Sequence, residues 1–186
     1  MQFTIFGENS REGTYILVID LYATVNVTFG RFLGGRAISL EQGQYLYVGS
    51  ALSGGNSSFP LAGRLLRHAS RSGNGRPHNI RRELFDFFIS VGYPAPDKKR
   101  DKKLHWHIDY LLDLPEAEIV HIVMLMGPSR IEHRLAELVA SMTEASTVVD
   151  RLGAQDARSG THLFRISDPA SLIANLKISV PGLMEM

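Results

Sequence analysis

The strongest constraint on the fold is the order in which two hydrophobic periodicities follow one another along the chain. Residues 13–20, GTYILVID, form an apolar, β-branched run that begins at a glycine. Residues 24–32 alternate with the period of two that a half-buried strand requires, and residues 44–49 form a third strand pattern after a glycine-rich turn. The chain is therefore predicted to open with three strands in a β-meander.

A helical periodicity follows these strands. Leu61, Leu65 and Leu66 recur at the spacing of one helix face, which predicts a short amphipathic helix that ends near Gly73. A second helix is expected from Pro77 to Phe88, where apolar side chains again form a stripe.

The second half of the chain returns to strands after a polar connection. Residues 104–112, LHWHIDYLL, alternate apolar and polar side chains and are predicted as a strand, as is the long apolar run at 118–126. The remaining predicted elements are a helix at 129–141, a strand at 162–166, a short helix at 169–176 and a last strand at 177–180. This order predicts an α+β domain with a mainly antiparallel central sheet flanked by helices.

Positive charge is concentrated in one segment of an otherwise balanced chain. Between Arg64 and Lys103 there are 11 Lys or Arg against 4 Asp or Glu, while the net charge of the whole chain is +1. Such a segment is typical of a polyanion partner, and a solvated, lysine-rich loop is the alternative. We expect a single domain over residues 1–186, with a basic insertion at about 72–103 and a C-terminal extension at about 167–186.

The composition also bears on the cellular compartment in which the protein is expected. The chain has no cysteine, which excludes disulfides and thiolate metal sites and favours a reducing, cytoplasmic location. The N-terminus lacks a basic start followed by a long apolar run, so no signal peptide is expected. The sequence contains no run of about 18 apolar residues, so no membrane span is expected. The oligomeric state stays open.

Two tyrosines stand beside glycines on predicted strands, in the strings GTY (13–15) and YVG (47–49). Arg64 and His68 follow one helical turn apart and therefore share a face. This set resembles the GIY-YIG nuclease superfamily. The further strings YLYVGSAL, RLLRH, HWHIDYLL and GAQDARSGTHLF, over roughly residues 12–166, look like one poorly characterised branch, found alone or joined to an endonuclease-III-type repair enzyme.

The resemblance implies a metal-dependent endonuclease that hydrolyses phosphodiester bonds, with DNA expected ahead of RNA as the substrate. It implies catalytic roles for Tyr15, Tyr47, Arg64 and His68, and a Mg²⁺ or Mn²⁺ ion held by Glu132. The ion would stabilise charge on the scissile phosphate. A tyrosine would orient or deprotonate the attacking water, and because a free phenol has a pKa of about 10, such a base needs cationic neighbours.

Further residues are expected to bind the substrate. Gly49 would allow a close backbone approach to a phosphate, and Ser50 would donate its hydroxyl. The full predicted substrate-binding set is Gly49, Ser50, Arg67, Arg71, His107 and Asp109. A basic set is expected to grip the nucleic-acid backbone and to make binding salt-dependent: Arg71, Arg76, Arg81, Arg82 and Lys98 to Lys103.

Several of these residues have structural alternatives. Tyr15 and Tyr47 could simply pack in the core. Glu132 could close a capping box with Ser129, in which case Glu137 is the substitute metal ligand. These alternatives stay open at the level of the sequence.

A second metal hypothesis rests on His105, His107 and Asp109, which would share the polar face of a strand. Along a strand they would fan over about 13 Å at roughly 3.3 Å per residue, which makes it hard for all three to converge on one ion. The alternative is a polar face that is exposed or that lines the nucleic-acid groove. Because this string is a signature of the branch that the chain resembles, we expect His107 and Asp109 to border the site. His162 and Asp156 could also approach the site. The rival functions are therefore a non-catalytic nucleic-acid-binding module of the same fold and a His/Asp metal-site protein.

Overall fold

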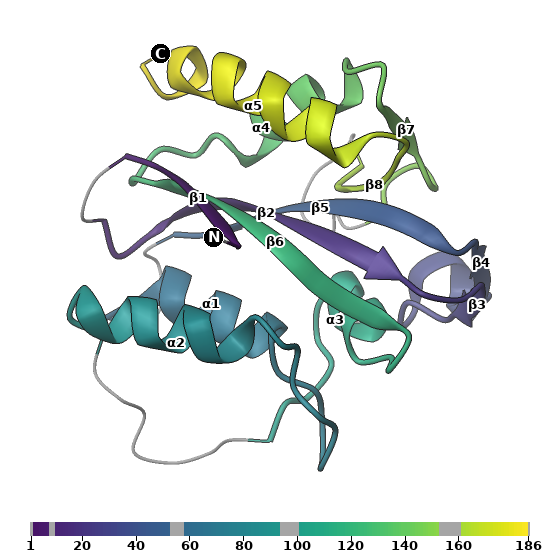
Figure 1. Ribbon diagram of the computed structural model, residues 1–186. Coiled ribbons are helices and arrows are strands. Elements are labelled where there is room, and N and C mark those ends of the chain that lie inside the picture. Colours follow the sequence, from purple (N-terminus) through teal and green to yellow (C-terminus); the bar gives the residue numbers. More distant parts are fainter. Residues whose placement is uncertain (1, 8–9, 53–57, 94–100, 153–160, 186) are drawn as a thin grey trace.

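A six-stranded sheet lies between two layers of helices (Figure 1). The computed structural model describes residues 2–7, 10–52, 58–93, 101–152 and 161–185. The strand order is β1-β6-β2-β5-β8-β7. The strands of this sheet are β1 (Phe3–Phe6), β2 (Gly13–Leu21), β5 (Gly43–Ala51), β6 (Ala117–Met126), β7 (Ala145–Thr147) and β8 (Leu163–Ile166). The α+β class is confirmed, and the sheet is mixed because β1 runs parallel to β6 while the other pairs are antiparallel.

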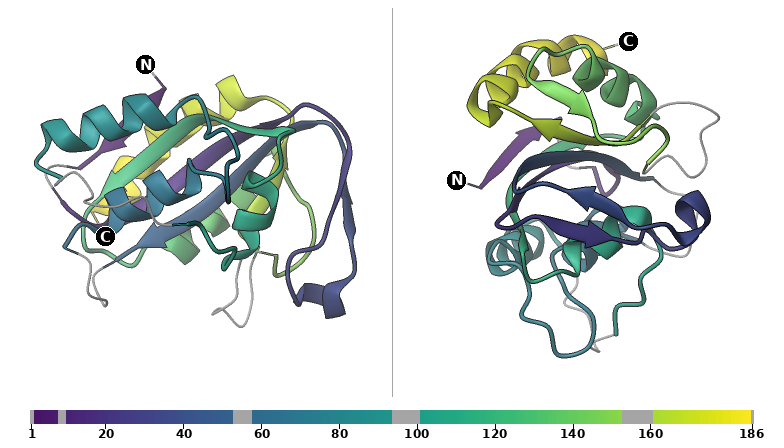
Figure 2. Two further views of the ribbon diagram at one scale, coloured as in Figure 1. Left: turned by 90° about the horizontal axis from the view of Figure 1, so that it is seen from below. Right: turned by 90° about the vertical axis from the view of Figure 1, so that its right-hand side faces the viewer.

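Each face of the sheet has its own helical layer. The helices are α1 (Pro60–His68), α2 (Arg81–Ser90), α3 (His107–Leu112), α4 (Glu132–Ala140) and α5 (Pro169–Met184). In Figure 1, α1, α2 and α3 lie below the sheet, while α4 and α5 lie above it. The view from below in Figure 2 shows the first three helices in front of the sheet. Among the described residues, no helix combines the length and the apolar character that a membrane crossing needs.

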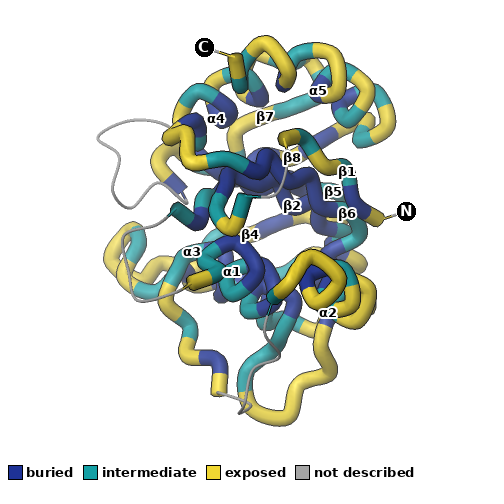
Figure 3. The backbone as a smooth tube through the Cα atoms, turned by 90° about the vertical axis from the view of Figure 1, so that its left-hand side faces the viewer, coloured by how far each residue is buried: buried dark blue, intermediate teal, exposed yellow. Residues whose placement is uncertain are grey.

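The central strand β2 supplies side chains to both layers. Tyr15 and Leu17 pack into the core beneath α1 and α2, whereas Ile16 and Val18 pack into the core beneath α4 and α5. Because both faces are covered, nearly every residue of the strand is buried, which explains why its sequence is continuously apolar. Figure 3 shows the buried strands as a dark core between largely exposed outer turns.

The predicted three-stranded meander is wrong in its middle strand. Only β3 (Val25–Val27) forms within the predicted segment 24–32, and it pairs with β4 (Ile38–Leu40) in a separate hairpin. A 3₁₀ turn, η1 (Phe32–Gly35), connects the two strands of this hairpin. Strand β2 therefore pairs directly with β5 along its whole length.

The predicted strand at 104–112 is also wrong, because its C-terminal part is the helix α3. Ile108, Leu111 and Leu112 are all buried, and their i, i+3, i+4 spacing is that of one helix face. Asp109 fixes the start of the helix by accepting hydrogen bonds from the backbone N–H groups of His105 and Trp106. The two-residue alternation in this segment is coincidental.

The C-terminal segment is one long helix rather than a short helix and a strand. Asp168 caps α5 by accepting a hydrogen bond from the Ser171 N–H. The buried residues Leu172, Leu176 and Val180 recur every four positions, so a single apolar stripe extends through the predicted strand at 177–180. Two other predicted helices start later than expected, since α2 begins at Arg81 and α4 at Glu132, whereas α1 ends at His68, before the predicted end near Gly73.

Candidate active site

Tyr15 on β2 and Tyr47 on β5 lie side by side on the sheet face that α1 covers. Their ring centroids are 6.5 Å apart. Gly49 is paired with Tyr15 across the two strands, and a Cβ atom on Gly49 would lie 2.6 Å from the Tyr15 hydroxyl and 2.8 Å from Cε1 of Tyr47. The glycine therefore provides space for two phenol rings, whereas the sequence had predicted that it provides space for a phosphate.

His68, in the last turn of α1, is hydrogen-bonded to Tyr15. The Tyr15 Oη and His68 Nε2 atoms are 2.8 Å apart, and both residues are fully buried. Burial lowers the pKa of His68 to about 4, so the imidazole is neutral at neutral pH. Its Nδ1 atom faces Asp109 Oδ1 at 3.4 Å. The carboxylate favours the proton on Nδ1, so Nε2 accepts the hydrogen bond that the Tyr15 hydroxyl donates.

Asp109 is a buried anchor behind this histidine. It accepts a hydrogen bond from Arg67 Nη2 at 2.6 Å, and the backbone N–H groups of His105 and Trp106 donate to the same carboxylate oxygen. Burial alone would raise the pKa of Asp109, but the contact with His68 and the surrounding donors lower it. The carboxylate is therefore ionised and held rigidly. The sequence had predicted substrate binding for Arg67 and Asp109, and the structure pairs them with each other.

Arg64 lies one turn before His68 on α1 and stacks on an indole ring. Its guanidinium carbon is 3.7 Å from the ring centroid of Trp106, whose ring is in turn 5.9 Å from that of His68. Burial raises the pKa values of both Tyr15 and Tyr47, although the charge of Arg64 lowers them. Both phenols are therefore protonated at neutral pH, and Arg64 alone does not produce a phenolate.

Glu132 belongs to the other helical layer. It is the first residue of α4, the Ser50 hydroxyl donates a hydrogen bond to its Oε2, and its Oε1 is 3.1 Å from His162 Nδ1. Burial would raise the pKa of Glu132, but these contacts with His162 and Ser50 lower it, so the carboxylate is ionised. Its charge raises the pKa values of Tyr15 and Tyr47, which places it within electrostatic range of both phenols.

The capping-box alternative for Glu132 is wrong. The helix α4 begins at Glu132 with Ile131 as its N-cap, so the carboxylate is not at the third helical position, and it is directed to Ser50 and His162. Glu137, the predicted substitute ligand, is exposed and pairs with His133 on the same helix at 3.2 Å. We call the two tyrosines and the four residues that act on them the tyrosine cluster: Tyr15, Tyr47, Arg64, His68, Asp109 and Glu132.

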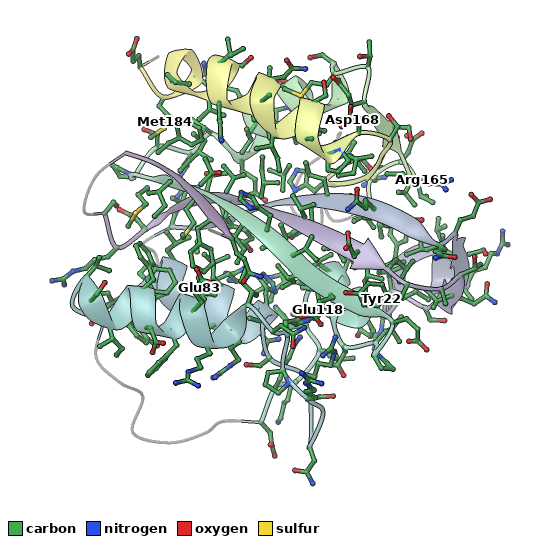
Figure 4. The ribbon with its side chains drawn as sticks, viewed as in Figure 1. Tyr22, Glu83, Glu118, Arg165, Asp168 and Met184 are labelled. Carbon is green, nitrogen blue, oxygen red and sulfur yellow. The ribbon has the colours of Figure 1, made fainter. Side chains whose placement is uncertain are left out.

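Arg71 does not join this cluster. Its guanidinium donates to the backbone carbonyl groups of Leu114, Arg76 and Ala117, and it lies 3.5 Å from Glu118. Figure 4 labels Glu118 near β6, below the sheet, on the side of α1, α2 and α3. The side chain of Arg71 is only 8% exposed, so it connects the end of α1 to the chain between α3 and β6 and presents little charge to solvent.

The basic segment is divided between buried and exposed side chains. Lys102 is buried and donates to the Ser70 carbonyl at 2.8 Å, and Arg81 donates to the Ser70 hydroxyl at 2.8 Å. Arg76 and Arg82 are exposed and remain suited to binding a polyanion. The predictions for Lys98 to Arg100 and for Asp156 lie outside the described residues.

His107 belongs to a separate hollow. Its ring centroid is 5.1 Å from that of Phe32 and 6.5 Å from that of Phe29, and these residues line a hollow of about 900 Å³ with Tyr110. Because α3 is a helix, His107 and Asp109 diverge, and the geometric premise of a shared His/Asp metal site does not hold. Within the described residues, no three His, Cys, Asp or Glu side chains are grouped closely enough to hold a metal ion.

The sequence predictions missed one site residue, Trp106. Trp106 is the platform for Arg64 and also contacts Arg67, whose guanidinium carbon is 4.8 Å from the indole centroid. Its position as the only tryptophan, between two histidines in the most distinctive string of the sequence, was the available signal. His162 was expected only as a residue that could approach the site, and its contact with Glu132 depends on a pairing between distant segments that local sequence does not encode.

The fold and the site together define an α+β sandwich protein with a buried tyrosine–histidine–aspartate chain against one face of its sheet. The chain belongs to the family described as domain of unknown function DUF123, whose family profile matches residues 14–184. This match includes every residue of the tyrosine cluster. No curated protein and no solved structure matches the sequence.

Proposed function

We propose that the protein is a metal-dependent nuclease that hydrolyses phosphodiester bonds, with DNA as its substrate. The observation that carries this proposal is the buried hydrogen bond between the Tyr15 hydroxyl and His68, with Asp109 behind the imidazole. A phenol linked to a neutral, oriented histidine is a means of moving a proton. A surface that only binds does not require such a device.

The proton path follows from the protonation states. Because its pKa is raised, Tyr15 cannot act as a resting phenolate; it can accept a proton from water only as it passes its own proton to His68. The pKa of His68, about 4, leaves its Nε2 free to accept at neutral pH. Asp109 then stabilises the imidazolium that forms, as a carboxylate does behind the histidine of a Ser-His-Asp triad.

Arg64 and Glu132 supply the complementary charges. The planar guanidinium of Arg64 can bind two oxygens of a phosphate and stabilise the negative charge that develops there. Glu132 fits a hard divalent cation such as Mg²⁺ or Mn²⁺, because its carboxylate is ionised and 30% of its side chain is exposed. When bound, the cation would stabilise charge on the scissile phosphate and the leaving oxygen.

Burial of the phenols limits access to this chemistry. Tyr15 is 0% exposed and Tyr47 only 6%, so a substrate can reach them only when a covering side chain moves. Arg64 is suited to this movement, because a phosphate can replace Trp106 as the partner of its guanidinium. The same burial favours a second candidate function, a nucleic-acid-binding module of this fold that does not cleave.

Conservative tyrosine variants test the proposal. The protein is incubated with single- and double-stranded DNA and RNA in Mg²⁺ or Mn²⁺, and cleavage is measured beside binding. Tyr15→Phe and Tyr47→Phe are expected to abolish cleavage of DNA and to keep binding. The matched controls are Tyr45→Phe, a buried tyrosine on the same strand as Tyr47, and Tyr22→Phe, which is 56% exposed after the far end of β2 (Figure 4).

The possible results separate the two functions. Cleavage that survives both active-site variants, or that is lost equally in the controls, contradicts the nuclease proposal. Tight binding without cleavage by the folded wild-type protein, unchanged by Tyr47→Phe, supports the binding module instead.

A further inference from the structure

His162 is a buried histidine whose ring nitrogens have no hydrogen-bond partner among the described residues. It lies directly before β8, where its N–H donates to the Leu152 carbonyl and its own carbonyl accepts from the Val48 N–H, both at 2.9 Å. The backbone is therefore fixed on both sides. The residue is only 5% exposed, and no hydrogen bond from the described residues reaches Nδ1 or Nε2. A buried ring nitrogen without a partner is costly, and a bound ion or water is the kind of group that satisfies it.

The carboxylate of Glu132 contacts this ring. The Nδ1 and Oε1 atoms are 3.1 Å apart, yet the two groups are out of line for an N–H···O hydrogen bond. Two ligands held at right angles, each about 2.1 Å from a divalent ion, lie about 3 Å from each other. The separation of the imidazole nitrogen and the carboxylate oxygen thus equals the distance between neighbouring ligands of one metal ion.

The second carboxylate oxygen of Glu132 is already committed. Ser50 donates its hydroxyl to Oε2, which holds the carboxylate so that Oε1 is the oxygen nearest His162. Such support from a neighbouring hydrogen bond orients metal ligands in known sites. Two protein ligands leave the other coordination positions to water and to substrate phosphate oxygens, as a nuclease ion requires.

We propose that His162 and Glu132 together bind the divalent ion, and that the imidazole makes the site prefer a transition-metal ion such as Mn²⁺ to Mg²⁺. Mg²⁺ takes oxygen ligands almost entirely, whereas first-row transition ions accept an imidazole nitrogen beside a carboxylate. This inference rests on the proposed function for the role of the ion, and it adds a second ligand and a metal preference.

The chain contains a matched control for this pair. His133 and Glu137 also place an imidazole nitrogen and a carboxylate oxygen close together, at 3.2 Å, but their side chains are 51% and 65% exposed. An ordinary surface ion pair of this kind provides no buried, prearranged ligands. Variants of His133 therefore reveal the effect of removing a histidine near a glutamate without removing the proposed site.

Metal binding is measured on the full chain without nucleic acid. Mn²⁺ affinity is obtained by electron paramagnetic resonance, Mg²⁺ affinity by competition, and pulsed measurements on bound Mn²⁺ test for a directly coordinated ¹⁴N nucleus. We expect a ¹⁴N coupling in the wild-type protein that disappears in His162→Gln. The same variant should weaken Mn²⁺ binding by about tenfold or more, with a much smaller change for Mg²⁺. His133→Gln should change neither affinity.

The measurements decide the inference separately from the nuclease proposal. Bound Mn²⁺ without ¹⁴N coupling, or equal losses in His162→Gln and His133→Gln, overturns the role of His162 even if the protein cleaves DNA. Nitrogen-coordinated Mn²⁺ without cleavage keeps the metal site and refutes the nuclease. If His162→Gln does not fold, the ¹⁴N coupling of the wild-type protein decides by itself.

Discussion

Gly49 is the residue on which the packing of the two phenols depends. Replacing it by alanine would place a Cβ atom 2.6 Å from the Tyr15 ring and hydroxyl, so the tyrosines must separate. Overpacking of this kind costs about 1–3 kcal/mol of unfolding free energy. We expect denaturant unfolding of Gly49→Ala to show an unfolding free energy that is lower by that amount. We also expect cleavage activity to fall under conditions where the variant is still folded.

The control for this change is Gly127→Ala, because a Cβ atom on Gly127 has no neighbour within 4 Å and the backbone there needs no positive φ. It should be neutral within about 0.5 kcal/mol. Equal unfolding free energies for Gly49→Ala and the wild-type protein would show that the phenols are packed more loosely than described.

Among single residues, the sequence predicted which side chains lie around the phenols better than it predicted the contacts that each one makes. Tyr15, Tyr47, Arg64 and His68 were named from the motif pattern, and the fold brings them together around the two phenols and Trp106. Glu132 was named as well, and its charge raises the pKa values of both phenols. The task of Asp109 was not predictable, because a buried carboxylate contacts His68 and Arg67 only after α3 has packed against α1. Local sequence encodes the start of a helix, but not the neighbour it meets.

Arg71 is one of the side chains that link the segment after α1 to the chain that leads into β6. Arg71→Ala would leave the carbonyl groups of Leu114 and Ala117 without their donor and Glu118 without its charge partner. Loss of a buried charged donor costs about 2–4 kcal/mol. We expect that loss in unfolding free energy, whereas the exposed Arg82→Ala should stay within about 0.5 kcal/mol of the wild type.

Nucleic-acid binding distinguishes this structural role from the substrate-binding role that the sequence predicted for Arg71. Arg82→Ala should reduce the salt dependence of DNA binding, since an exposed cation near a phosphate releases counterions. Arg71→Ala should leave that salt dependence unchanged at temperatures where the variant is folded. A large change in the salt dependence for Arg71→Ala would restore it to the substrate-binding set.

The predicted elements were right where one periodicity dominated. The segments at 13–20, 44–49 and 118–126 are strands because their side chains fill both layers of the sandwich. The segment at 104–112 carries two periodicities at once, and the tertiary contact of Ile108, Leu111 and Leu112 decides for the helix. In the same way, the strand preference of the β-branched Ile178 and Val180 is outweighed by the apolar stripe that continues from Leu172.

The whole molecule should lose stability in mild acid because it buries neutral histidines. The pKa of His68 is lowered to about 4 and that of His78 to about 3, in both cases chiefly by burial. His78 is fixed as neutral, since its Nδ1 accepts from the Ile119 N–H and its Nε2 donates to the Leu112 carbonyl. Below the unfolded pKa of about 6.5, the unfolded chain binds protons that the folded chain does not.

Unfolding free energy measured from pH 7.5 to 4.5 checks this behaviour. It should be constant above about pH 6.5 and then fall by up to about 1.4 kcal/mol per pH unit for each of the two histidines. The lowered pKa values of Asp109 and Glu132 act in the same direction, but only below about pH 4.3, outside this window. His78→Gln should reduce the slope by about one proton; an unchanged slope would contradict the assignment.

The flanking of β2 by β5 and β6 along its whole length has a consequence for how the site can adapt. A strand hydrogen-bonded on both edges and covered on both faces has no local way to open, so the backbone of Tyr15 should exchange its amide hydrogen only when the entire domain unfolds. A ligand must therefore be accommodated by movement of side chains, those of Arg64, Trp106 and Glu132, while the backbone of β2 keeps its position.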